Sequence, residues 1–437
     1  MHSQSTPKTN EIPLQLAGIF MVALGTTFYI YEFFIRVIPS VISVELMHEF
    51  SISASLLGVL SSGFYYAYTF MQIPSGLLCD RYGPKVLLVI GITLCGIATF
   101  LFGMTQSSFM IGFSRMACGA ASAFAFICPL VLTTHWFPSK YFALVTGVIQ
   151  TMGCLGAIFG GHPLATLVSE FGWRSTLIYS GYVGVFIGLI IYLFLQNKPD
   201  SDEIFIEPNA CMSDDHNNTT EWQRLKKIIT KRQNWHIALT GFCCWGPIAV
   251  FAELWGIQYI HHDLGLSIDL AAVQLLWVWV GIAIMSPIVG WWSDNIQSRK
   301  TPILICFSIG LLATLLLILP EKASLWTLDI TMFLLGTSAG IQPITFGLIR
   351  EQNSQTVAGT AIAFNNMAVI FGGVILQPLF GFLLDFFWQG SLLNGVRMYG
   401  IFEYQHAMWI LPFCCLIGFF NTLWFVDETN CQRIDVS

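Results

Sequence analysis

The sequence predicts an all-α membrane protein with twelve transmembrane helices in two six-helix pseudo-repeats. Three observations predict this fold: the composition, a series of long apolar windows, and a charged turn that occurs twice. Of the 437 residues, 55% are hydrophobic and 10% are charged, whereas an ordinary soluble domain has about 25% charged residues. So few charges cannot cover the surface of a water-soluble protein of this size, but a lipid bilayer requires an apolar exterior.

Twelve apolar windows are long enough to cross a hydrocarbon core of about 30 Å, which takes ~20 helical residues. The first six cover residues 14–43, 54–78, 85–104, 108–133, 142–169 and 175–196. The second six cover residues 234–260, 270–292, 301–320, 325–349, 357–384 and 406–427. We therefore expect an N-terminal half at 1–196 and a C-terminal half at 234–437.

The segment 197–233 is the only long polar stretch, and it predicts a partly disordered linker between the halves. Its basic end, residues 224–232, fits either an amphipathic helix on the membrane surface or a solvated loop.

If the termini, this linker and the charged turns share one side, that side holds 14 of the 19 Lys and Arg residues. This bias places both termini in the cytoplasm. Short loops without added domains favour a bacterial cytoplasmic (inner) membrane.

A charged turn lies between the second and third windows, and a copy that keeps fewer of its residues occurs about 214 residues later. In both copies an acid follows a glycine by four positions and a base follows it by nine. The residues are Gly76, Asp80, Arg81, Gly83 and Lys85 in the first copy and Gly290, Asp294 and Arg299 in the second. A second match at nearly the same offset pairs Glu170 and Trp173 with Asp385 and Trp388. The repeat indicates two homologous membrane halves, an arrangement typical of transporters.

We expect this turn to act in gating. The carboxylate of Asp80 is placed to pair with Arg81 or to accept from the positive N-terminus of a neighbouring helix, which would latch the halves in an outward-facing state. The alternative is that the basic residues only set the topology. Gly76 and Gly83 are expected to serve close helix approach and the tight turn.

With these motifs the chain resembles the major facilitator superfamily over essentially its whole length. The first charged turn matches the loop between helices two and three of that family, Arg115 and Gly119 match its helix-four motif, and Gly172-Trp173-Arg174 resembles its turn between helices five and six. The glycines before Pro163 lack the Gly-Pro order found in many antiporters, which weakens an antiporter assignment. The general layout is also similar to the branch of lysosomal dipeptide transporters and their bacterial relatives.

The resemblance implies that helices one, four, seven and ten line a central cavity. Polar and aromatic residues in the corresponding region are then candidate lining residues: Tyr29, Tyr65, Gln150, Trp245, Gln342, Asn365 and Asn366. Buried amides alternatively join helices to one another. Because two adjacent amides cannot both face one packed neighbour, Asn365 and Asn366 are the most informative of this set.

Four charges lie about two or more helical turns inside predicted spans: Glu32, Arg36, Arg115 and Glu253. Such charges cost at least about 2.5–3.5 kcal/mol each unless they are paired or hydrated, and they usually face an internal cavity. Glu32 and Arg36 share a helical face and form either a structural ion pair or a pair that exchanges partners with substrate. Arg115 is expected to bind a substrate anion or Glu32. Glu253 is the candidate proton site, unless it lies near the outer mouth.

These residues predict a secondary transporter that moves a small polar organic solute by alternating access. Paired arginines and carboxylates favour an anionic or zwitterionic solute such as a carboxylate, an amino acid or a dipeptide. The alternatives are specifically a proton-coupled organic-anion symporter, or a non-transporting membrane sensor on the same fold. We expect no catalytic residues, cofactor or metal, and no nucleotide-binding loop is found. The expected partners are the substrate, the lipid bilayer and, as a candidate coupling ion, protons, with no nucleic acid and a monomeric state.

Overall fold

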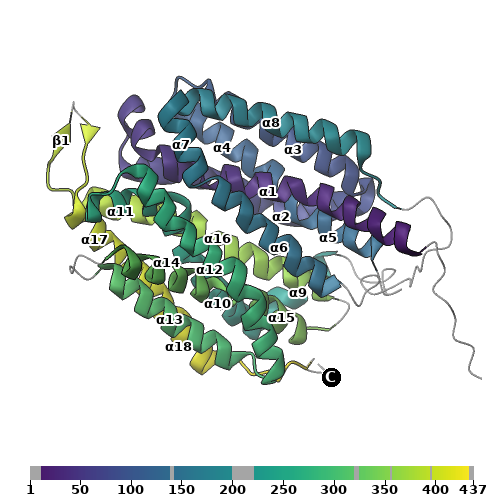
Figure 1. The fold of residues 1–437 in the computed structure, drawn as a ribbon. Coiled ribbons are helices and arrows are strands. Elements are labelled where there is room, and N and C mark those ends of the chain that lie inside the picture. Colours follow the sequence, from purple (N-terminus) through teal and green to yellow (C-terminus); the bar gives the residue numbers. More distant parts are fainter. Residues whose placement is uncertain are drawn as a thin grey trace, which may run out of the picture.

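The computed structural model describes residues 11–137, 142–198, 221–318, 324–354, 357–393 and 396–432. Long helices lie side by side in these ranges (Figure 1), and their only sheet is a hairpin of β1 (Leu392–Leu393) and β2 (Val396–Arg397). The predicted all-α fold is confirmed. Large exposed aromatic side chains such as Phe70 (79% exposed) and Trp326 (78% exposed) fit a surface that faces lipid.

The helices follow the predicted windows, and several spans are divided by a short break. The first group is α1 (Glu11–Phe50), α2 (Ala54–Tyr82), α3 (Pro84–Gly103), α4 (Ser108–Ser122), α5 (Phe124–Trp136), α6 (Phe142–Phe159), α7 (His162–Phe171) and α8 (Trp173–Phe194). The basic end of the linker forms a helix rather than a loop, α9 (Glu221–Thr230). The second group is α10 (Arg232–Val250), the π-helix η3 (Phe251–Trp255), α11 (Gly256–Leu264), α12 (Ile268–Asn295), α13 (Lys300–Ile318), α14 (Leu325–Ala339), α15 (Gln342–Glu351), α16 (Ala358–Phe386), α17 (Ile401–Met408) and α18 (Ile410–Phe425).

Among the described residues, eleven helical spans are long and apolar enough to cross a membrane. The remaining expected span forms α2, a helix of 29 residues, but it is not one of the eleven. Its serines, glycines and tyrosines lower its mean hydropathy. Because α2 packs between α4 and α16, it needs less apolar surface than a helix that faces lipid.

Local sequence signals explain where the helices begin and turn. Ser53, Ser107, Ser267 and Ser324 each precede a helix and accept a hydrogen bond from a backbone N–H of its first turn. Gly83 and Gly172 have φ of 77° and 79° and join α2 to α3 and α7 to α8. Side chains with a Cβ are strained at such φ values, so the expected role of Gly83 in the tight turn is confirmed.

The packing of the helices repeats between the two groups. In the first group α2 packs on α4, α3 on α8 and α1 on α6. In the second, α12 packs on α14, α13 on α18 and α10 on α16. The same set of pairs therefore occurs twice in chain order, as expected for a duplicated six-helix unit.

Glycines allow the closest helix contacts within each group. A Cβ on Gly119 would collide with the backbone of Phe64, and one on Gly336 would collide with the backbone of Val278. These sites lie at the equivalent interfaces α4 with α2 and α14 with α12. Small residues at such positions let helix backbones approach one another.

We expect Gly119→Ala to destabilise the protein by about 1–3 kcal/mol, because overpacking against backbone forces the helices apart. Thermal unfolding of the purified protein in detergent measures the effect. Gly147→Ala on α6 is the matched control, since no described atom outside its own helix backbone lies within 4 Å of a Cβ placed there and alanine favours a helix. Equal melting temperatures for the two variants would contradict the close contact at Gly119.

The two groups meet tightly at the end of the bundle that carries the β1–β2 hairpin, the hairpin end. Asp385 of α16 accepts a hydrogen bond of 3.0 Å from the backbone N–H of Ser55. It also forms an ion pair of 3.0 Å with Arg397. The hydroxyl of Tyr399 accepts from the N–H of Ala54 at 3.1 Å. The N-terminus of α2 is thus capped by a carboxylate from the other group, which suits the helix dipole.

The contact of α2 with α16 continues as far as a hydrogen bond of 3.0 Å from Asn366 to Gln72. One turn further, no atom of a described residue outside its own helix backbone lies within 4 Å of a Cβ placed on Gly76, and the same holds for Gly290. The close helix approach expected at Gly76 is therefore wrong for this structure. The Cβ positions of both glycines thus face open space near the charged turns, at the end of the bundle that we call the turn end.

The second charged turn forms an ion network inside its own group. Arg299 pairs with Asp294 at 2.8 Å, and its Nε donates to Glu351 at 3.2 Å. Glu428, beyond α18, accepts from the backbone N–H groups of Arg299 and Lys300 at 2.8 and 2.9 Å. Burial raises the pKa of Glu428, but these hydrogen bonds outweigh it and the pKa lies below its ordinary value.

The first charged turn is tied to its own group as well. The backbone N–H of Lys85 donates to Asn197 at 2.8 Å, and Arg81 is exposed beside the ring of Tyr82. The side chain of Asp80, on which the expected latch depends, lies outside the described residues. The latch therefore stays a prediction.

Candidate functional site

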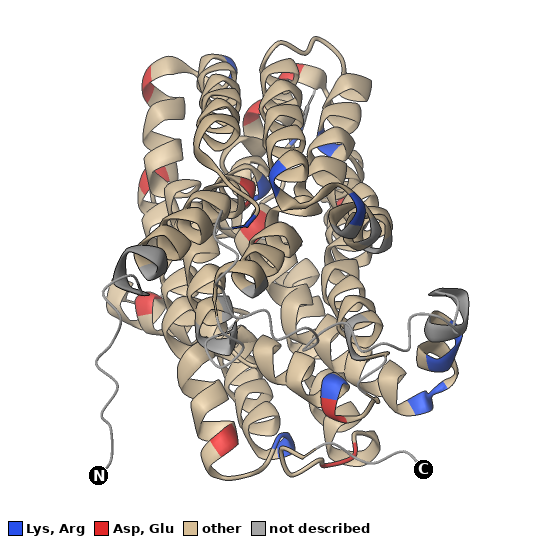
Figure 2. Ribbon diagram, turned by 90° about the vertical axis from the view of Figure 1, so that its right-hand side faces the viewer, with Lys and Arg blue, Asp and Glu red and all other residues tan. Residues whose placement is uncertain are grey.

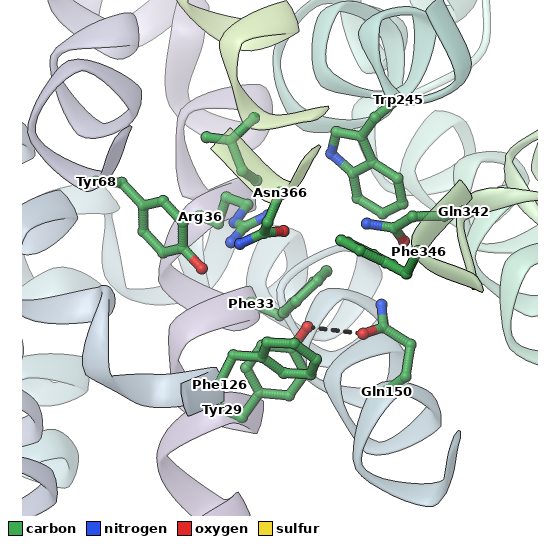
Figure 3. Close-up of a pocket in the computed structure, with 11 residues that line it drawn as sticks. Tyr29, Phe33, Arg36, Tyr68, Phe126, Gln150, Trp245, Gln342, Phe346 and Asn366 are labelled. Carbon is green, nitrogen blue, oxygen red and sulfur yellow. Dashed lines mark hydrogen bonds between the residues drawn. The ribbon is translucent and has the colours of Figure 1, made fainter. Parts of the chain in front are cut away.

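A pocket of about 340 Å³ lies between the two groups of helices near the middle of the bundle (Figure 3). Charged residues are sparse along the helices, and a small group of them lies in the interior (Figure 2). The pocket is lined by side chains from α1, α2, α5, α6, α10, α15 and α16, namely Tyr29, Phe33, Arg36, Tyr68, Phe126, Gln150, Trp245, Gln342, Phe346, Asn366 and Ile370.

Arg36 is the only described charged residue that lines this pocket. Its Nε and Nη2 donate to Oε1 of Glu32, with a distance of 2.9 Å for Nε, so the expected ion pair is confirmed. Its Nη1 lies 3.9 Å from Oε1 of Glu253 in the other group. Arg36 therefore contacts one acid from each half, Glu32 closely and Glu253 more distantly. All three side chains are at most 2% exposed.

Aromatic rings surround the guanidinium of Arg36. Its Cζ lies 4.5 Å from the ring centroid of Phe33 and 5.5 Å from those of Phe64 and Tyr68. Ring faces attract a cation and also keep water away from it. The charge is thus held in an apolar surrounding, where its attraction for an anion is strong.

Arg115 does not form an ion pair with Glu32, contrary to one of the two roles expected from the sequence. Its Nη1 donates to the backbone carbonyl of Ile35 at 2.9 Å, and its Nη2 donates to that of Arg36 at 3.4 Å. Pro39 has no N–H to bond the carbonyl of Ile35 four residues earlier. Arg115 satisfies that carbonyl instead, and it is not among the residues that line the pocket.

Glu253 lies in the interior and not at the outer mouth, which had remained an alternative. It is 1% exposed and belongs to the π-helix η3. Neither carboxylate oxygen accepts a hydrogen bond from a described residue, and the same is true of Oε2 of Glu32. Single π-turns inserted in helices occur frequently at functional sites, and an unpartnered buried carboxylate is most stable when it is protonated or close to a cation.

The predicted amides divide between the pocket and the helix packing. Gln150 accepts from the hydroxyl of Tyr29 at 3.1 Å inside the pocket. Asn366 also lines the pocket, whereas Asn365 donates to Thr345 at 2.9 Å and is fully buried against α15. The expectation that the two asparagines face different neighbours is confirmed, and Asn365 is not a lining residue.

The predicted residues Tyr29 and Trp245 line the pocket, but four other aromatic lining residues were missed in the sequence, namely Phe33, Tyr68, Phe126 and Phe346. Phe33 lies between Tyr29 and Arg36 at spacings of four and three residues, so helical periodicity alone places these three side chains on one face. Tyr68, Phe126 and Phe346 have no comparable signal, because aromatic residues are abundant in every span. Only their meeting in space identifies them.

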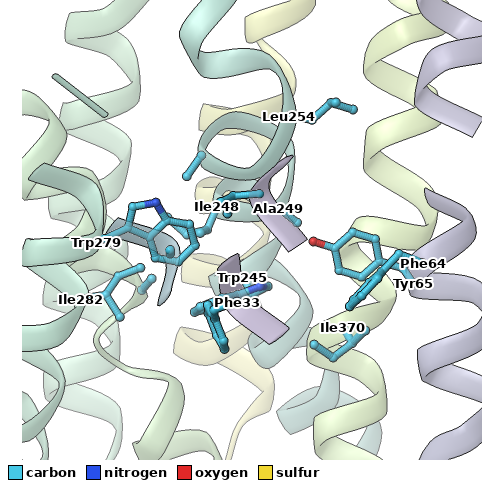
Figure 4. Packing of buried hydrophobic residues seen from close by; sticks show 14 of the residues in the cluster. Phe33, Phe64, Tyr65, Trp245, Ile248, Ala249, Leu254, Trp279, Ile282 and Ile370 are labelled. Carbon is cyan, nitrogen blue, oxygen red and sulfur yellow. The ribbon is translucent and has the colours of Figure 1, made fainter. Parts of the chain in front are cut away.

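Aromatic packing separates the pocket from the hairpin end. The rings of Phe33 and Trp279 meet edge to face at 6.0 Å, and Trp279 lies 6.4 Å from Trp245. These residues belong to the buried cluster shown in Figure 4. Beyond Trp279 lies a second, apolar pocket of about 190 Å³ that includes Val37 and Ser40. Phe33 lines the first pocket and Trp279 lines the second, so the contact of these two rings lies between the pockets and joins the two halves.

A duplicated bundle of membrane-crossing helices around a charged central pocket defines the class of multi-pass membrane transport proteins. The model of the Major Facilitator Superfamily matches residues 17–282 and 255–432, and the chain belongs to this family. The resemblance seen in the sequence is confirmed, and the protein is a transporter rather than an enzyme.

Two relatives with named substrates share about a quarter of their aligned residues with this chain. A probable sulfoacetate transporter of Cupriavidus necator is 24% identical, over 82% of this chain and 85% of its own length. A probable L-galactonate transporter of Escherichia coli is 23% identical, over 88% of this chain and 89% of its own length. The crystal structure of a bacterial homolog of the human lysosomal transporter Spinster, inward-facing and unoccupied, superposes with a TM-score of 0.75 at 15% identity, covering 96% of this chain and 98% of that one.

Proposed function

We propose that the protein is a secondary transporter that moves a small organic anion by alternating access, with Arg36 as the anion contact. The observation that carries this proposal is the position of Arg36, a buried guanidinium that faces a pocket between the halves. A guanidinium binds carboxylates and sulfonates in a forked geometry. The named relatives support an anion, since sulfoacetate and galactonate are both organic acids.

Proton coupling is the second part of the proposal, and the contacts of Glu253 favour it. An anion that takes Nη1 of Arg36 would weaken the interaction of that nitrogen with Glu253, 3.9 Å away. A carboxylate left without a cation and without hydrogen bonds binds a proton more readily. Substrate binding thus favours protonation of Glu253, and anion and proton would cross the membrane together.

The same proposal assigns the two ends of the bundle to the two sides of the membrane. The turn end and both termini face the cytoplasm of a bacterial inner membrane, in agreement with the Lys and Arg distribution. Contacts at the hairpin end and open space at Gly76 and Gly290 then correspond to an inward-facing state. In this scheme the first charged turn closes the cytoplasmic side in the opposite state, and a single chain carries out the whole cycle.

Counterflow in proteoliposomes tests the proposal. Purified protein is reconstituted, the vesicles are loaded with an unlabelled anion, and entry of the labelled anion is followed for sulfoacetate, L-galactonate and benzenesulfonate. We expect at least one of these solutes, all of which are ionised at neutral pH, to enter faster than into protein-free vesicles. If none enters, in vesicles where labelling of surface residues shows folded protein, an organic-anion transporter is excluded.

A further inference from the structure

The chemistry of the pocket lining restricts which organic anion fits. Six of its eleven side chains are aromatic, from Tyr29, Phe33, Tyr68, Phe126, Trp245 and Phe346. They come from five different helices and surround the space that Arg36 faces (Figure 3). Ring faces and edges at such positions offer stacking partners to a planar apolar group.

The polar capacity of the lining is small, and part of it is already used. The carbonyl of Gln150 accepts from Tyr29, and the amide of Asn366 donates to Gln72. A polyhydroxylated acid would bury several hydroxyl groups here, and each buried hydroxyl without a partner costs about 1–3 kcal/mol. The lining therefore disfavours sugar acids.

The charge of the lining also limits the substrate. Arg36 is the only described cation that faces the pocket, and the buried Arg115 is engaged by backbone carbonyls of α1. A second carboxylate on the substrate would be buried without a counter-charge, which is strongly unfavourable. One anionic group is the number that this pocket can neutralise.

We propose that the substrate is an aromatic monoanion, that is, a ring that bears one carboxylate or sulfonate. This substrate class rests on the proposed transport function. The acidic group takes Nη1 of Arg36, and the ring lies among Phe126, Trp245 and Phe346. Tyr29 and the two glutamines then contact polar substituents on the ring edge.

Binding calorimetry on the full chain in lipid nanodiscs tests this class. Benzoate, gluconate and terephthalate share a carboxylate and differ in aromaticity, hydroxyl content and charge. We expect the Kd of benzoate to be at least about tenfold lower than that of either other acid at neutral pH. Phe126→Leu and Phe346→Leu should each raise the Kd of benzoate about three- to tenfold, whereas Phe113→Leu, a matched change at a half-exposed phenylalanine of α4, should not.

Gluconate or terephthalate binding as tightly as benzoate would overturn the aromatic monoanion, and so would an unchanged benzoate Kd in both pocket variants. In either case counterflow of sulfoacetate or L-galactonate would leave the proposed transport function intact. If benzoate fails to bind and no anion shows counterflow, both proposals are overturned.

Discussion

Arg36→Gln is expected to reduce anion flux by at least about 100-fold and to destabilise the protein. The substitution removes the only described charge that faces the pocket and leaves Glu32 buried without its partner. Breaking one side of a buried pair costs about 3–5 kcal/mol, because the remaining charge is uncompensated. Counterflow and thermal unfolding of the same preparations measure the two effects.

The double variant Glu32→Gln with Arg36→Gln separates binding from folding. Because no lone charge of that pair remains buried, its melting temperature should recover beyond the sum of the single changes, while flux stays lost. Arg174→Gln is the matched control: this arginine pairs with Glu49 at the hairpin end, and its side chain is 32% exposed. Flux that survives in the double variant would show that Arg36 is only structural.

Glu253→Gln should abolish uptake driven by an imposed pH gradient and leave exchange of labelled for unlabelled anion in place. Glutamine resembles the protonated carboxyl, so the loaded site keeps its neutral form, but no proton can be released at the end of the cycle. Exchange needs no such release. The change should be tolerated in the fold, since neither oxygen of Glu253 accepts a hydrogen bond from a described residue.

Comparison of the two assays on one set of vesicles decides the role of Glu253. Glu170→Gln, at an exposed acid of α7, controls for the loss of one negative charge. Gradient-driven uptake that persists in Glu253→Gln would place proton coupling elsewhere, and Glu32, whose Oε2 also has no described hydrogen-bond partner, becomes the next site to test. A wild-type protein that ignores the gradient would instead be a uniporter.

Local features of this protein were predictable from the sequence because they depend on neighbours a few residues away. Apolar windows specify membrane helices through their length, Gly83 specifies its turn through its positive φ, and Glu32 meets Arg36 through the four-residue helical spacing. The family followed from the same local motifs, the two charged turns above all. Each of these features depends on backbone geometry that the residues themselves impose.

The site itself was decided by tertiary packing. Glu253 approaches Arg36 from a helix 217 residues away in the chain, and no periodicity encodes that meeting. Arg115 was expected to face an anion, but Pro39 leaves the carbonyl of Ile35 without its helical hydrogen bond, and a buried carbonyl in lipid must find another donor. Asn365 and Asn366 are adjacent on one helix, so their side chains point in directions about 100° apart. Asn365 therefore packs against α15, whereas Asn366 lines the pocket.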